Sequence, residues 1–250
     1  MQQFRANLSN ELFKLSKRKK YLVFLILGAL ICVISALRGI IVNHITDGGV
    51  SNESILAGLM NSNLPFVLLI FLPLMAILAA SDLFVSEQAD HTIRFSLMRP
   101  VGKGTIFFSK AAAVFVLCAA DLGVLYLVNT LAQVLLGGGT EGVLTSLGAC
   151  LLDLIPLGVL ILFFCLLNQL IHGSGLTVLL CVVLYVALVV MGTYLPGVGG
   201  LVFTGYLRWH NLWIGITLPL FSLLPRIGLL VGYGLVFGCC GYVLFDRREA

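Results

Sequence analysis

Long apolar runs separated by short polar segments dominate this chain. Each run exceeds the roughly 17 residues that a helix needs to cross the hydrocarbon core at about 1.5 Å per residue. Inside lipid every backbone N–H and C=O must be bonded within its own segment, so such runs are expected to be helices. They lack the strict alternation of apolar and polar residues that is typical of membrane barrels. The pattern predicts an all-α integral membrane protein with six transmembrane helices, over residues 21–42, 64–85, 107–136, 147–170, 176–195 and 226–245.

The first 20 residues form a polar, basic segment ahead of the first apolar run. Its apolar residues recur every three or four positions and so share one helical face: Phe4, Leu8, Leu12 and Leu15. This spacing predicts an amphipathic helix on the cytoplasmic surface of the membrane. A signal peptide is the alternative, but its apolar core runs only about 7–15 residues. The run over residues 21–37 is longer and further spans follow, which favours a retained anchor.

Lys and Arg residues are unevenly distributed between the two sides of the predicted spans. If both termini are cytoplasmic, the inner segments hold 12 of the 15 basic residues, and only Arg38, Arg208 and Arg226 fall elsewhere. Cytoplasmic segments of membrane proteins carry an excess of Lys and Arg. We therefore expect a multi-pass protein of the cell membrane with both termini in the cytoplasm.

The composition supports a membrane location and excludes several other classes of protein. Apolar residues make up 60% of the chain and charged residues 10%, whereas soluble domains have about 45–50% and about 25%. The basic residues lie beside apolar runs, so no nucleic-acid partner is expected. The seven cysteines all lie in apolar stretches without zinc-ligand spacing, which predicts small buried hydrophobes and no metal site.

The segment from residue 86 to residue 105 is the most informative polar stretch. It is short, charged and amphipathic, and Pro100 is a helix stop. A solvated connector is the simplest interpretation. However, Glu87, Thr92 and Leu97, followed by Arg99-Pro100 and Lys103, resemble in order and spacing the loop between the second and third spans of ABC-transporter permeases of the type-2 exporter family.

Other features of the chain are similar to the same family. The basic amphipathic start, the six spans and the closing Phe245-Asp246-Arg247-Arg248-Glu249 all resemble it. In that family the loop forms a coupling helix that docks on a separate ATPase. The resemblance implies that the ATPase-coupling residues are Glu87, Thr92, Arg94, Arg99 and Lys103.

No motif for nucleotide binding or catalysis occurs in this chain. The nearest string to a phosphate-binding loop, Gly102-Lys103-Gly104-Thr105, lacks the early glycine and the Ser or Thr directly after the Lys. The four histidines are scattered, and Ser174 lies in a glycine-rich turn without an evident base. We therefore expect no enzyme and no cofactor in this chain, with ATP and magnesium bound by the partner ATPase.

Two carboxylates lie deep within predicted spans, Asp121 near the middle of the third and Asp153 in the outer part of the fourth. A charge at the bilayer centre costs about 2.5–3.5 kcal/mol on insertion scales, so both are expected to face the protein interior or a cavity. They are candidates for the translocation path or for interhelical bonds. Arg38, near the outer end of the first span, is a possible partner for Asp153.

The segment over residues 196–225 is rich in glycine and aromatic residues. An ordinary loop on the headgroups is one interpretation, because Trp and Tyr favour the membrane interface. The family resemblance implies instead a re-entrant hairpin of two short helices before the last span, acting as an outer gate. The outer-gate candidates are Arg208, Trp209, His210 and Trp213.

Together these features predict a single transmembrane permease domain over residues 1–250, of bacterial source. The expected function is ATP-driven export of an amphipathic or hydrophobic substrate such as a peptide, toxin or drug. The expected partners are an ABC ATPase subunit, a second copy of the chain or a related permease, and membrane lipids. The alternative is a secondary transporter or channel that works without an ATPase.

Overall fold

The computed structural model describes residues 2–45, 56, 59–89, 102–171, 173–195, 199–214 and 220–248. Every regular element in these residues is helical, which confirms the all-α prediction. The elements are α1 (Gln2–Ser16), α2 (Lys19–Ile45), α4 (Leu59–Phe66), the π-helix η1 (Val67–Phe71), α5 (Leu72–Ala89), α7 (Lys103–Leu135), α8 (Val143–Leu170), α9 (Ser174–Tyr194), the 3-10 helices η2 (Phe203–Tyr206) and η3 (Trp209–Leu212), and α11 (Leu220–Arg248).

Six helical segments among the described residues are long and apolar enough to cross a membrane, as predicted. α4, η1 and α5 run on from one another and form a single span. The candidate spans are Lys19–Val42, Leu59–Val85, Lys103–Leu135, Val143–Leu170, Gly175–Tyr194 and Leu223–Arg247. Each overlaps one of the six apolar runs in the sequence.

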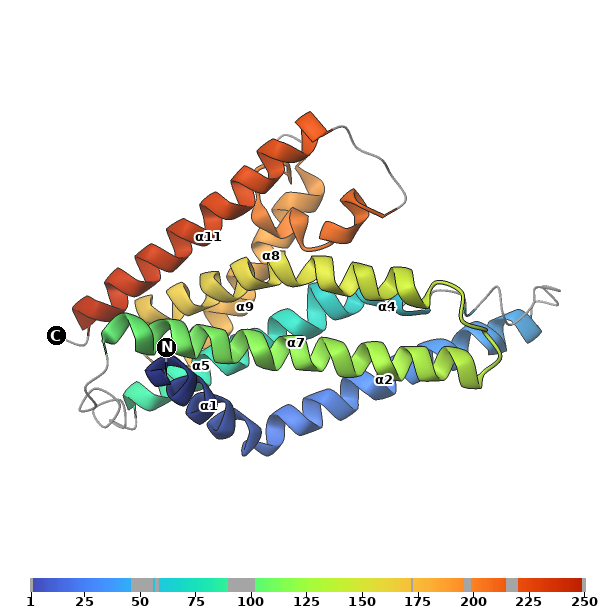
Figure 1. Ribbon diagram of the computed structural model, residues 1–250, viewed down its shortest axis with the longest axis horizontal. Coiled ribbons are helices and arrows are strands. Elements are labelled where there is room, and N and C mark those ends of the chain that lie inside the picture. The colour runs from blue at the N-terminus through green and yellow to red at the C-terminus, as the bar shows by residue number, and fades with distance from the viewer. Residues whose placement is uncertain are drawn as a thin grey trace.

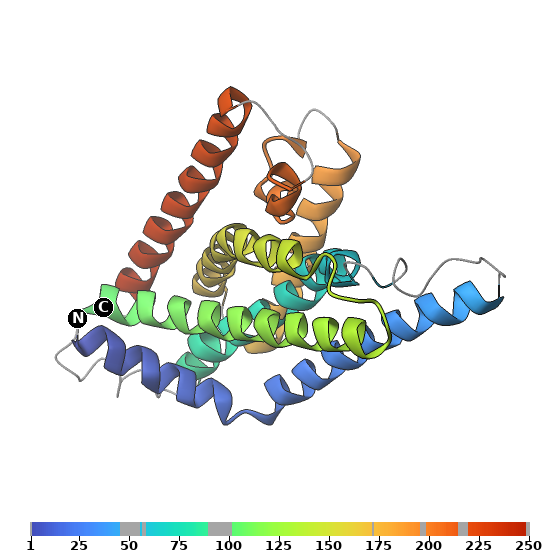
Figure 2. The same ribbon diagram turned by 45° about the vertical axis from the view of Figure 1, so that its right-hand side comes forward.

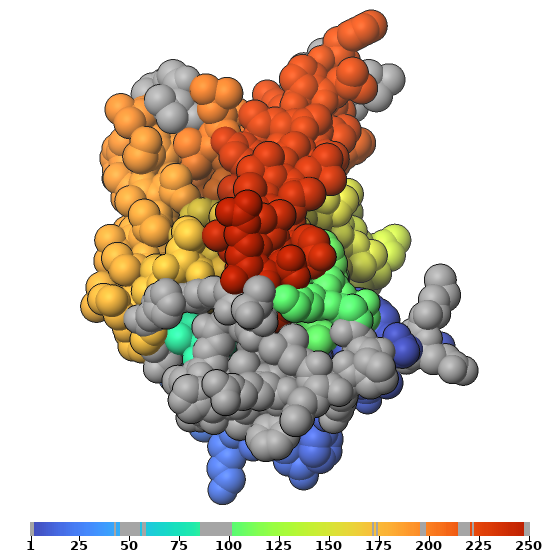
Figure 3. Space-filling model, turned by 90° about the vertical axis from the view of Figure 1, so that its left-hand side faces the viewer, coloured from blue at the N-terminus to red at the C-terminus, as the bar shows by residue number. Residues whose placement is uncertain are grey.

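The start of α1 and the end of α11 lie at the same end of the helix bundle (Figure 1). We call this the terminal end, and the opposite end, where α7 turns into α8, the distal end. At the terminal end the start of α7 lies beside the end of α11, and Lys103 Nζ is 3.2 Å from Asp246 Oδ1 (Figure 3). An even number of spans requires this arrangement of the two chain ends.

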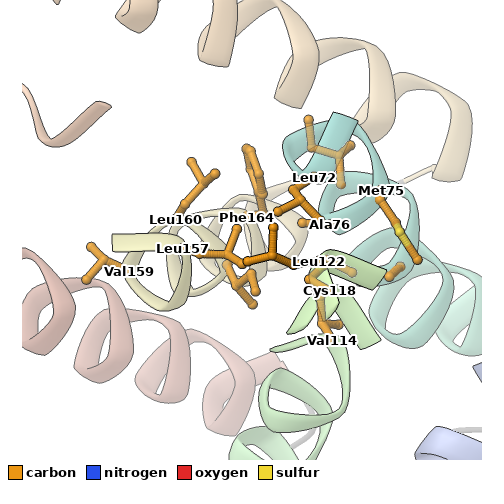
Figure 4. Close-up of a cluster of buried hydrophobic side chains, with 14 of the residues drawn as sticks. Leu72, Met75, Ala76, Val114, Cys118, Leu122, Leu157, Val159, Leu160 and Phe164 are labelled. Carbon is orange, nitrogen blue, oxygen red and sulfur yellow. The ribbon is translucent and has the colours of Figure 1, made fainter. Parts of the chain in front are cut away.

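The span from α4 to α5, together with α8, forms the centre of the bundle. Within their most apolar stretches, 67% and 56% of the residues are buried, against 17% for α2 and α9 and 22% for α11. Side chains from α5, α7 and α8 interlock in a core that includes Leu72, Met75, Ala76, Val114, Cys118, Leu122, Leu157, Leu160 and Phe164 (Figure 4). The apolar outer faces of α2, α9 and α11 are therefore available to lipid or to another membrane protein.

The cysteines follow this division between centre and periphery. Five of them are buried, as the sequence predicts: Cys32, Cys118, Cys150, Cys165 and Cys181. Cys239 and Cys240 are exposed, which corrects the prediction for these two. α11 packs mainly on α8, so only one face of α11 is covered and an apolar residue on another face stays exposed.

The π-helix η1 marks a defined break in the central span. In a regular α-helix the carbonyl of Leu69 would accept from the N–H of residue 73, but this residue is proline and has no N–H. The Tyr185 hydroxyl of α9 donates to Leu69 O instead, at 2.8 Å. Leu72 N donates to Val67 O, which is the longer bond of a π-turn. A side chain from a neighbouring helix thus satisfies a backbone group that the proline leaves without a partner.

The apolar face predicted for the first helix is present in α1, and it packs on protein. Leu15 is fully buried, and Leu8 and Leu12 pack against the hydrophobic core. α1 lies along α7 in both views of the bundle (Figures 1 and 2). Its position at the membrane surface stays a prediction.

Residues 199–214 fold as two 3-10 helices that pack on α8 and α9. α11 then begins at Leu220, so the predicted end of the hairpin at residue 225 was too late. Pro225 does not end this helix, because helices in membranes tolerate proline when neighbouring groups satisfy the freed carbonyl. A dip of residues 199–214 into the membrane stays a prediction.

Candidate functional site

Two polar sites occupy opposite ends of the bundle. We call the first the α1 anchor and define it by five residues: Glu11, Arg18, Lys20, Asp82 and Lys110. We call the second the hairpin latch and define it by Asp153 and His210.

Asp82 of α5 forms one half of the α1 anchor. Its side chain is only 11% exposed and receives two cations from the junction between α1 and α2. Arg18 Nη1 lies 2.8 Å from Oδ1, and Lys20 Nζ lies 2.6 Å from Oδ2. The Tyr21 hydroxyl also donates to Oδ2. These contacts hold the α1–α2 junction on α5.

Lys110 of α7 forms the other half of the α1 anchor. Its side chain is fully buried, and its ammonium lies 3.4 Å from Glu11 Oε2 and donates to Leu83 O at 3.0 Å. The ammonium is also 5.9 Å from the centre of the Phe84 ring, within cation–π range. A buried ammonium is tolerated only when it is paired and hydrogen-bonded, and these three contacts meet that need. α1 is thereby tied to α5 and α7 together.

These two helices flank the segment that resembles the coupling loop. α5 ends at Ala89 and α7 begins at Lys103. Three predicted coupling residues, Thr92, Arg94 and Arg99, lie outside the described residues, as does the side chain of Glu87. The fifth, Lys103, contacts Asp246 of α11 through both its carboxylate and its backbone carbonyl, the latter at 3.1 Å. Their docking role therefore stays a prediction.

The hairpin latch joins η3 to α8. Asp153 is fully buried, and both of its carboxylate oxygens contact His210. The backbone N–H of His210 donates to Oδ1 at 2.8 Å, and His210 Nδ1 lies within hydrogen-bond distance of Oδ2, at 2.6 Å. The predicted pairing of Asp153 with Arg38 is wrong, because His210 occupies both oxygens and Arg38 is exposed on α2.

The predicted gate residues divide into two buried and two exposed side chains. Trp209 is 2% exposed and packs edge-to-face on Tyr206, with ring centres 5.9 Å apart. His210 is held by the latch, whereas Arg208 and Trp213 are exposed. η3 therefore inserts one face into the bundle and presents the other at the surface.

Asp121 lies in neither site. Its side chain is 3% exposed within α7, and its Oδ2 has no hydrogen-bond partner among the described residues. An interhelical bond, one of the two expected roles, is therefore not seen for this oxygen within the described part of the chain.

Sequence reasoning missed the anchor, although a signal for it was present. Asp82 lies inside the predicted second span and Lys110 inside the third apolar run, where a charge is costly and must be paired. Glu11 interrupts the predicted amphipathic helix next to Leu12. A charge within each of these two apolar runs would have indicated an ion pair with another segment of the chain.

The described residues contain no group of three or more His, Cys, Asp or Glu that could hold a metal ion. Comparison with known families shows that residues 7–206 match the family described as ABC-2 family transporter protein. This range covers most of α1, five of the six candidate spans and η2. No curated protein matches the chain.

Proposed function

Because this chain belongs to the ABC-2 family of transporter proteins, and is a permease of an ABC transporter, we propose that it is the membrane half of an exporter. Its substrate is amphipathic or hydrophobic, such as a peptide, toxin or drug. Hydrolysis of ATP takes place on a separate ATPase subunit, which binds the nucleotide and magnesium. Both termini and the terminal end face the cytoplasm.

The α1 anchor is the observation that supports this proposal most directly. It joins α1 to the two helices that flank the coupling segment, through ion pairs of 2.6–3.4 Å. A force applied to residues 90–101 by the ATPase acts on the ends of α5 and α7. Because α1 is bonded to both, the three helices respond as one unit.

The hairpin latch is our reason to propose that a second part of the transporter, at the distal end, moves during transport. In an exporter the substrate leaves on this side, and the exit must close when the transporter faces inward. A transporter of this kind has two states, and nucleotide favours one of them by binding it more tightly. Release of His210 from Asp153 gives the hairpin a discrete second state.

The exposed apolar faces support pairing with a second permease, either another copy or a related chain. α2, α9 and α11 are covered on one side only. Lipid covers part of this surface. A second permease covers another part and doubles the number of docking sites for the ATPase.

A test of the docking role uses the permease purified from its source cells with the ATPase bound. Reversing the charge of Glu87 and Arg94 together is expected to reduce the recovered ATPase activity while the permease stays in the membrane. The matched control reverses Glu141 and Arg38, which are exposed in the distal half of the molecule. Full ATPase recovery and full transport by the Glu87/Arg94 variant would show that these residues do not dock the ATPase. Transport by vesicles that contain only this chain would favour a secondary transporter or channel.

A further inference from the structure

Two arginines at the distal end line a hollow. Neither of them belongs to the α1 anchor or to the hairpin latch. The hollow has a volume of 270 Å³ and lies between η3 and the first turns of α11. Arg208 precedes η3, and Arg226 lies in α11. Tyr206, Asn211, Leu212 and three glycines complete the described lining.

No carboxylate lies among the described residues that line this hollow, so none there balances its two positive charges. Between Asp153 and Asp246 the sequence contains no Asp or Glu. Asp153 is bonded to His210, and Asp246 lies at the terminal end next to Lys103. Neither Arg208 nor Arg226 forms a salt bridge with any residue that the structure describes.

The charges are also unusual for their side of the membrane. Only three of the 15 basic residues lie on the predicted outer side, and two of them line this one hollow. Outer segments are normally poor in Lys and Arg, so the pair is not explained by topology. Guanidinium groups bind phosphate or carboxylate with two parallel N–H donors, which an ammonium does not offer.

The walls of the hollow are held in place by contacts around it. The latch fixes His210, two residues after Arg208, on α8. The Tyr206 hydroxyl donates to Gly200 O at 2.5 Å. Gly199 packs so closely that a Cβ atom there would lie 2.6 Å from Gly192 O. The site is therefore formed before any ligand arrives, which lowers the entropic cost of binding.

The surroundings indicate an amphipathic source for the anion. On α11, Phe221 is 92% exposed and Leu224 is 72% exposed, within five residues of Arg226. Trp213, 45% exposed, lies beyond η3 and has the amphipathic ring that favours the headgroup level. The hollow itself suits one compact charged group, because sites for drug-sized ligands occupy about 300–1,000 Å³.

From these observations we propose that the hollow binds a phosphate group, with Arg208 and Arg226 as its ligands. An anionic phospholipid of the outer leaflet is the source that the exposed apolar residues favour. Its phosphate enters the hollow and its acyl chains lie along α11. A soluble phosphate ester has the same charged group without the chains. This assignment stands whether or not the protein is an exporter.

The chain carries its own optical reporter for this site. Its two tryptophans, Trp209 and Trp213, both lie within five residues of Arg208 along the chain. The full-length protein is placed in phosphatidylcholine nanodiscs that contain a small amount of spin-labelled phosphatidylglycerol or spin-labelled phosphatidylcholine. Stronger quenching of tryptophan fluorescence by the anionic lipid is expected. Native mass spectrometry provides a second readout by counting retained phosphatidylglycerol.

Three variants distinguish specific binding by the two arginines from a general attraction of anionic lipid to positive surface charge. Arg208→Gln and Arg226→Gln are each expected to weaken the preference for phosphatidylglycerol about fivefold, the value of one surface arginine near anionic lipid. Arg38→Gln removes the same charge from exposed α2 and is expected to have no effect. Circular dichroism checks that all three variants stay folded.

Addition of inorganic phosphate or glycerol phosphate shows whether the bound phosphate group comes from a phospholipid or from a soluble phosphate ester. If these compounds change the fluorescence of the wild type but not of Arg208→Gln, and phosphatidylglycerol is not preferred, the ligand is a soluble phosphate. Absence of any response to either source overturns the proposal. An equal loss in Arg38→Gln overturns it as well, because the attraction would then be general surface charge.

Discussion

Lys110 of α7 is fully buried and pairs with Glu11 of α1, with 3.4 Å between Nζ and Oε2. Glu11 has a second partner, Lys14, whose Nζ lies 2.9 Å from Oε1 and whose side chain is 35% exposed. Lys110 is the more deeply buried member of the pair, so removal of the Glu11 carboxylate takes a counter-ion from the charge that is costlier to bury.

Glu11→Gln is therefore expected to destabilise the protein more than Lys110→Met. Loss of one partner of a buried ion pair costs about 3–5 kcal/mol, and Lys110→Met leaves Glu11 bonded to the half-exposed Lys14. The double variant is expected to recover part of the loss, because no charge is then left buried alone. Thermal unfolding of the purified protein checks this order, with exposed Lys17→Met as the control. Equal effects of the two single variants would contradict it.

Loss of the hairpin latch is expected to loosen η3 while the spans stay folded. His210→Ala leaves the Asp153 carboxylate buried without the ring N–H, and a buried unpaired polar group costs about 1–3 kcal/mol or more. Acrylamide should then quench Trp209 more strongly, measured in a Trp213→Phe background. Asn211→Ala changes an exposed neighbour on η3 and is the control. Unchanged quenching in His210→Ala would show that packing alone holds the hairpin.

Tyr185→Phe tests the bond at the π-helix. It removes only the hydroxyl that donates to Leu69 O, so a carbonyl in the central span loses its partner. Hydrogen bonds between membrane helices contribute about 0.6–1.7 kcal/mol, and a drop in thermal stability of that size is expected. Tyr194→Phe removes the same group from a side chain that is 77% exposed and should leave stability unchanged. A stable Tyr185→Phe protein would mean that Leu69 O finds another donor.

Asp121→Asn is expected to leave transport and stability intact, or to raise stability. The amide keeps hydrogen-bonding capacity and never carries a charge, whereas the carboxylate is buried in α7 with Oδ2 unbonded within the described residues. Expression level, melting temperature and substrate export provide the measurements. A variant that is stable but does not transport would show that the acid acts on substrate or protons.

The orientation rests on the basic residues and has a direct test. With 12 of 15 Lys and Arg in the segments assigned to the cytoplasm, a reporter fused after Ala250 is expected to be active only inside the cell. Fusion after Thr140, in the turn between α7 and α8, should give the opposite result. Activity outside the cell for the Ala250 fusion would reverse the topology.

The six spans could be predicted because a membrane-spanning helix is recognised from the length and the apolar composition of a single segment. The run over residues 147–170, for example, needs no partner to be identified, and it lies within α8. Which side chains meet depends instead on how each helix is rotated about its axis, and hydropathy carries no such information. Asp153 was predicted to lie near Arg38, yet its partner is His210, 57 positions further along the chain.

The charged residues of the anchor illustrate the same limit. Asp82 and Lys110 are visible in the sequence as charges within apolar runs, so a pairing requirement could be read from each. The partner of Lys110 comes from α1 and the partners of Asp82 from the junction between α1 and α2, and hydropathy alone indicates neither. Packing of α1 on α7, decided by Leu15 and its neighbours, brings them together.

The position of both chain ends at the terminal end has a consequence for protein engineering (Figure 2). Two copies can be joined head to tail by a soluble linker, since the second copy then enters the membrane in the same direction as the first. Such a tandem fixes the stoichiometry of the pair and allows a substitution to be carried in one half only. A tandem that transports as well as separate chains would establish that two identical permeases suffice. A substitution in one half of the tandem would then show how much each copy contributes to transport.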